Sequence, residues 1–184
     1  MTAQEFWNEF KEIFKDGTES KKQAIKLWYD YTNFIIDQIC GILRKNDLEP
    51  QKEFYRTDII GYKELRKKAN EKVLGFLKKS LWSLEVAIEH ENNDTLWMQE
   101  ITKLMNLYCP LRIVICYLPY RYKDKHLDFL SEINNYISVL SSYNNMQNGE
   151  FMIIIGDSKC NGDNKRFCHY TPYIFKDSGF EQLL

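Results

Sequence analysis

The sequence predicts an α/β protein with a mixed central sheet flanked by helices and an N-terminal helical extension. Two short, continuous apolar runs, LRIVICYL (111–118) and FMIII (151–155), are typical of strands buried on both faces. Helical patterns separate such runs, and strands joined by helical crossovers indicate a layered α/β domain. We expect one domain over residues 1–184, with leading helices over 1–46 and a sheet-containing core over 53–175.

Two amphipathic helices are expected at the start of the chain. Thr2 and Glu5 have the spacing of a capping box, which favours a helix beginning there. A longer apolar stripe predicts a second helix over 20–46, ending before Pro50. The second helix and the aromatic N-terminus offer a surface for a protein partner or a second copy of the chain. The aromatic residues concerned are Phe6, Trp7, Phe10 and Phe14.

The core elements are expected to begin with a strand and a helix. EFYRTDIIGY (53–62) is aromatic and β-branched and predicts a single strand, and the basic segment 63–79 has apolar residues at helical spacing. A strand over 81–91 follows, and we expect it to lie between strands 53–62 and 111–118. Helices 20–46 and 95–108 are expected to pack on its faces.

The remaining elements complete the sheet and its cover. After strand 111–118, an apolar stripe from Leu127 to Leu140 predicts another helix. Strands are then expected over 151–155 and 169–175.

Composition narrows the class of protein. The chain is 44% hydrophobic and 15% aromatic, which argues against disorder, and no apolar run approaches the roughly 20 residues of a membrane span. The first residues lack the features of a signal peptide, so we expect a cytoplasmic protein with no membrane association. The net charge is −1, but segment 63–79 is basic and predicts either a solvated helix face or a phosphate-binding patch. Its candidate contacts to nucleic acid are Lys63, Arg66, Lys67, Lys68 and Lys72.

Carboxylates recur in the strand expected over 81–91, although glutamate is disfavoured in strands. Alternation along the strand predicts two faces, Leu84, Val86, Ile88 and His90 on one and Glu85, Ala87, Glu89 and Glu91 on the other. If strands 53–62 and 81–91 pair, the isolated Asp58 stands beside Glu89 and Glu91, where a divalent cation would neutralise the three charges. The other interpretation is the wet face of a half-exposed strand. His90, on the apolar face, is expected to be a core histidine.

This pattern resembles the PD-(D/E)XK nuclease family, which has the restriction-endonuclease-like fold with a core of helix, three strands, helix and strand. Asp58 corresponds to the first acid of the family motif and Glu89 to the second, whereas Glu91 stands where a lysine is usual. The resemblance implies that Lys103, on the next helix, supplies the missing cation. It also implies that Asp58, Glu89 and Glu91 bind Mg²⁺ or Mn²⁺.

The activity implied by the resemblance is phosphodiester hydrolysis by a nuclease or a nuclease-like domain of a defence or repair system. The metal would activate a water molecule, and Glu91 would orient or deprotonate it or bind a second ion. Glu85 and Glu100 are more distant candidates. The alternative is a catalytically inactive nuclease-fold protein that acts as a protein-interaction module.

Overall fold

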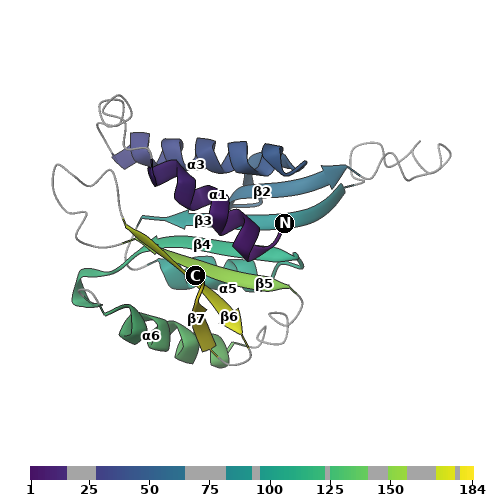
Figure 1. The fold of residues 1–184 in the computed structure, drawn as a ribbon. Helices are drawn as coiled ribbons and strands as arrows, with labels where there is room; N and C mark the ends of the chain where they lie inside the picture. The colour runs from purple at the N-terminus through teal and green to yellow at the C-terminus, as the bar shows by residue number, and fades with distance from the viewer. Residues whose placement is uncertain are drawn as a thin grey trace.

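The computed structural model describes residues 1–15, 28–64, 82–92, 96–122, 125–140, 149–156, 169–176 and 179–184. These residues form a seven-stranded mixed sheet with helices on both faces (Figure 1), which confirms the predicted α/β class. The described helices include none that is long and apolar enough to cross a membrane.

The elements alternate along the chain much as the apolar patterns indicate. Their bounds are α1 (Ala3–Lys15), α3 (Trp28–Lys45), β1 (Glu49–Phe54), β2 (Thr57–Glu64), β3 (Trp82–Glu91), α5 (Trp97–Met105), β4 (Leu111–Tyr117), a 3-10 turn at Tyr120–Tyr122, α6 (His126–Ser138), β5 (Glu150–Gly156), β6 (Tyr170–Lys176) and β7 (Gly179–Gln182). The strands lie in the sheet in sequence order. Strands β3, β4 and β5 are parallel, and antiparallel pairs extend the sheet on both sides.

The predicted position of β3 is confirmed, because it pairs with β2 on one side and with β4 on the other. Two apolar layers cover the sheet. Helices α1 and α3 pack on one face and helices α5 and α6 on the other, with α1 in front of the sheet and α5 behind it in Figure 1. Continuous apolar runs form the central strands because both faces of these strands are buried.

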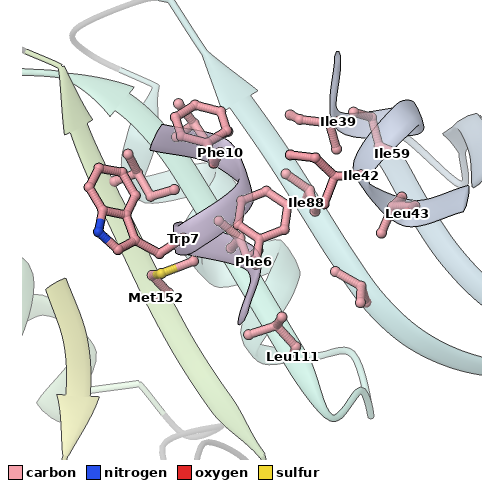
Figure 2. Close-up of a cluster of buried hydrophobic side chains, with 14 of the residues drawn as sticks. Phe6, Trp7, Phe10, Ile39, Ile42, Leu43, Ile59, Ile88, Leu111 and Met152 are labelled. Carbon is pink, nitrogen blue, oxygen red and sulfur yellow. The ribbon is translucent and has the colours of Figure 1, made fainter. Parts of the chain in front are cut away.

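Helix α1 begins where the capping box predicts. The Thr2 backbone N–H donates to Glu5 Oε2 at 2.7 Å, and the Glu5 N–H donates to Thr2 Oγ1 at 3.2 Å. The aromatic side chains of α1 then point onto the sheet (Figure 2), where Phe6 and Phe10 are fully buried and Trp7 is nearly so. The predicted use of these three side chains as a docking surface is therefore wrong, because they form the core of this chain.

Two predictions about β2 and its neighbours are also wrong. Residues 53–62 form the end of β1, a two-residue turn and most of β2, rather than one strand. Lys63 and Glu64 extend β2 instead of beginning a helix. The rest of the predicted helix 63–79, with Arg66, Lys67, Lys68 and Lys72, lies outside the described residues, as does the 20–27 part of helix 20–46.

A β-bulge changes the predicted faces of β3. Gly61 pairs with Val86 and Tyr62 with Leu84, so β3 has one extra residue, Glu85, at this point. Because of this extra residue, the side chains of β3 that precede Glu85 point to the opposite faces from those that simple alternation predicts. Leu84 consequently packs on the α5–α6 side, whereas Val86 packs on the α1–α3 side, which corrects the prediction that they share a face.

Candidate functional site

Asp58 and Glu89 lie opposite each other at one end of the β2–β3 pair. Ile59 pairs with Ile88, so the next step along the antiparallel ladder brings these two acids together. The Asp58 backbone N–H approaches Glu89 Oε2 at 3.3 Å, and the His90 backbone N–H donates to Asp58 Oδ2 at 2.8 Å. Each carboxylate therefore accepts a hydrogen bond from the backbone of the other strand, which fixes both side chains at the strand ends.

Helix α5 places a lysine against this pair. Lys103 Nζ lies 2.8 Å from Glu89 Oε1 and also forms an ion pair with Glu100, one turn earlier on the same helix. Its third contact is a hydrogen bond of 2.7 Å to the backbone carbonyl of Arg56, in the β1–β2 turn. The structure thus brings together Asp58 and Glu89, as the expected strand pairing predicts, and Lys103, as the resemblance implies, with Glu100 as the third acid.

The environment of these groups favours an additional positive charge. Glu89 is only 1% exposed, and its burial, together with the nearby charges of Asp58 and Glu100, raises its pKa to about 8 against the lowering effect of Lys103. Burial likewise raises the pKa of Asp58, although the hydrogen bond from His90 and the charge of Lys103 oppose the shift. Burial therefore raises the pKa of both strand carboxylates.

Lys103 remains the cation of the cluster. Its own burial disfavours the charged form, but the hydrogen bonds and charges of Glu100 and Glu89 outweigh that effect and raise its pKa. Three carboxylates thus share one ammonium group. Among the three acids, the pKa of Glu89 is the one raised to about 8, because it is the most deeply buried and lies near Asp58 and Glu100.

The other predicted residues lie further from this centre. Glu91 is half-buried at the end of β3, opposite Cys116 of β4, and its charge acts on the Cys116 thiol. The charges that shift the pKa of Glu89 come from Asp58, Glu100 and Lys103. Glu85, at the bulge, acts on Cys109, and Lys63 is exposed near the opposite end of β2. From the sequence, Glu100 was only among the more distant candidates. Its spacing of three residues from Lys103, which favours an ion pair on a helix, was the signal that could have placed it in the site.

The donor set fits a hard divalent cation only in part. Mg²⁺ prefers carboxylate oxygens and keeps several waters, so it needs few protein ligands. Glu89 Oε1 and Glu100 Oε2 are buried, and both contact the Lys103 ammonium group. However, no three His, Cys, Asp or Glu side chains within the described part of the chain are grouped closely enough to hold a metal. Asp58 and Glu89 are the first candidates, and water and substrate would complete the coordination.

No protein-family model matches this chain, and a search of curated proteins finds no relative. The residues of the site are therefore the basis for any functional conclusion.

Proposed function

We propose that this protein is a divalent-metal-dependent nuclease that hydrolyses phosphodiester bonds at the Asp58–Glu89 site. The observation that carries the proposal is the buried Glu89, held against Asp58 and within ion-pair distance of Lys103. Burying carboxylates together is unfavourable, and such arrangements are common where a protein binds a metal or activates water. Such an enzyme would act in the cytoplasm, which is the location that the sequence predicts.

The order of elements supports the proposal. Among the described elements, helix α3, strands β1, β2 and β3, helix α5 and strand β4 occur in this order, and residues 65–81, between β2 and β3, lie outside the described residues. This is the core order that the resemblance to the PD-(D/E)XK family implies. The two acids lie on adjacent strands, and the lysine lies on the following helix. Since one fold serves many functions, the arrangement of the side chains carries more weight than the order of the elements.

Each residue has a distinct role in the proposed reaction. When bound by Asp58 and Glu89, Mg²⁺ or Mn²⁺ would polarise the scissile phosphate and lower the pKa of an attacking water. Glu89 would release its proton as the cation binds, because the cation favours the carboxylate. Lys103, held by the Arg56 carbonyl, would keep a positive charge beside the phosphate. Glu100 would position Lys103, and Glu91 would orient water from the end of β3.

Cation binding tests the site independently of any substrate. Calorimetric titration with Mg²⁺ and Mn²⁺ in buffers of different ionisation enthalpy measures the protons released. With the pKa of Glu89 at about 8, we expect release approaching one proton per cation at pH 7 and tighter binding as the pH rises toward 8. Glu89→Gln should remove this release. Glu85→Gln is the matched control, since Glu85 lies on the same strand at the bulge.

Cleavage of DNA and RNA substrates tests the activity. Asp58→Asn and Glu89→Gln should each lower metal-dependent cleavage by roughly 100-fold or more, because each removes a negative charge from the metal site while conserving volume. Glu91→Lys restores the residue usual in the family and should preserve or raise activity. Absence of cleavage by both the unmodified protein and Glu91→Lys, without cation binding, would rule out the nuclease.

The alternative is a catalytically inactive nuclease-fold protein that binds a partner. One observation favours it: Lys103 already neutralises part of the charge of Glu89 and Glu100 without a metal. The buried aromatic residues of α1 cannot provide the interface, so the partner, whether a protein or a second copy of the chain, would bind elsewhere. Nucleic acid is the partner under the nuclease proposal, and Lys63 is the one described member of the predicted basic patch.

A further inference from the structure

The turn between β1 and β2 has an unusual composition for its geometry. Phe54 pairs with Thr57, so the turn contains only Tyr55 and Arg56. Both have positive φ angles, 46° and 68°, as a type I′ hairpin turn requires. Such turns favour Asn-Gly, because glycine has no Cβ atom to clash in the left-handed region and the short polar side chain of asparagine can hydrogen-bond locally there. A tyrosine and an arginine here cost stability that Asn-Gly would not, and such strain is concentrated at functional sites.

The turn also forms one wall of the candidate site. The backbone carbonyl of Arg56 accepts the 2.7 Å hydrogen bond from Lys103, and Asp58 follows two residues later. Because Lys103 is also paired with Glu89, the turn and the carboxylates are joined through one side chain. A ligand that contacts the tip of the turn is therefore adjacent to the proposed metal ligands.

The side chains of the turn are available to a ligand. Tyr55 is 84% exposed, and Arg56 is also exposed. The Tyr55 ring meets Phe54 edge-to-face, with centroids 4.6 Å apart. Further edge-to-face contacts connect Phe54 to Trp82 and Trp82 to Tyr62, and these three rings are only partly buried. An aromatic row thus supports Tyr55 from behind while leaving most of its ring open to solvent.

We propose, on the basis of the nuclease function above, that Tyr55 and Arg56 hold an unpaired nucleotide beside the site and that the substrate is single-stranded nucleic acid. An exposed aromatic ring stacks on a base face, which is available in a single strand and covered by neighbouring bases in a duplex. The guanidinium of Arg56 binds a neighbouring phosphate. These are positioning residues, since they contact the substrate away from the scissile bond.

The decisive variant improves the turn while removing the proposed contacts. Tyr55→Asn combined with Arg56→Gly supplies the preferred residues of a type I′ turn, so the melting temperature should stay the same or rise. Affinity for a short fluorescein-labelled single strand, measured by anisotropy in EDTA to prevent cleavage, should fall about 10- to 100-fold through loss of stacking and a phosphate contact. A merely structural turn would show no such loss.

Two single variants provide controls. Tyr55→Phe keeps the ring and should bind single strands nearly as tightly as the unmodified protein. Tyr108, which is 85% exposed after α5 and before β4, matches Tyr55 in exposure but lies outside the turn, so Tyr108→Ala should not change binding. The same labelled strand, annealed into a duplex, should bind more weakly than the single strand.

The outcomes separate this inference from the nuclease proposal. Equal binding by the double variant and the unmodified protein, or preference for the duplex, would overturn the role of the turn. Cation-linked proton release and its loss in Glu89→Gln would still support the metal site in that case. If the double variant loses single-strand binding but the unmodified protein binds no cation, the role of the turn is supported and the metal-dependent chemistry is not.

Discussion

Glu89 and His90 are neighbours on β3 that are buried to almost the same extent but lie in different surroundings. Their exposed fractions are 1% and 5%. Burial disfavours the charged form of each, so it raises the pKa of Glu89 to about 8 and lowers the pKa of His90 to about 4. His90 belongs to the α1–α3 face and Glu89 to the α5–α6 face, since successive side chains of a strand alternate.

The difference lies in their neighbours. His90 Nε2 lies 3.0 Å from the Tyr117 hydroxyl, which lies 3.0 Å from that of Tyr170, and Tyr170 in turn contacts the Tyr31 hydroxyl. This neutral network suits a neutral imidazole and confirms His90 as a core histidine. Glu89 instead meets two acids and an ammonium group. Burial alone therefore does not distinguish these two groups, whereas the charges of the surrounding side chains do.

The largest effect on stability is expected on the α1–α3 face. Phe10 is fully buried and touches Phe6, Phe14 and Tyr170. Phe10→Ala should lower the free energy of unfolding by about 3–5 kcal/mol through lost burial and a cavity, as measured by urea denaturation. The same truncation at the less buried Phe14 should cost less. A loss below about 1 kcal/mol at Phe10 would mean that α1 does not carry the core.

On the α5–α6 face, replacing Glu89 is expected to give a gain in stability that depends on pH. Because the pKa of Glu89 is about 8 in the folded state and 4.5 when unperturbed, the unfolded chain holds fewer protons between these values, and stability falls as the pH rises. Glu89→Gln removes this dependence. Its stability relative to the unmodified protein should rise by up to about 1.4 kcal/mol per pH unit from pH 4.5 to 8.

Denaturation at several pH values, with and without Mg²⁺, measures this gain. The cation should reduce the advantage of the variant, because it stabilises the ionised Glu89. Parallel pH profiles for Glu89→Gln and the unmodified protein would show that Glu89 is not buried against other acids.

The smallest effect on stability is expected from a substitution in the neutral network of His90, Tyr117, Tyr170 and Tyr31. Tyr117→Phe keeps the ring but removes the hydroxyl that His90 Nε2 contacts, so a buried nitrogen loses that partner. The cost should be about 1–2 kcal/mol, with cleavage unchanged because the network lies on the face away from the carboxylates. A change in cleavage comparable to that of Glu89→Gln would mean that the two faces are coupled through β3.

Several elements were predictable because their signals are local. The continuous apolar runs of β4 and β5 predict strands covered on both faces, and Thr2 and Glu5 predict the start of α1. The pairing of β2 with β3 and the isolation of Asp58 predict that Asp58 meets Glu89. The two-residue turn was missed, since Tyr-Arg is not a usual type I′ pair, and so was the bulge at Glu85.

The sequence alone determined the alternation of strands and helices, the apolar layers and the pair of acids, because each depends on spacing along the chain. Only the tertiary structure decided that the aromatic face of α1 is covered by the sheet, since an amphipathic helix has the same pattern whether it covers its own core or a partner. It also decided that Glu100 and Lys103 face Glu89. The distance between a helix and a strand depends on how they pack, and that packing is not encoded in the spacing of residues within either element.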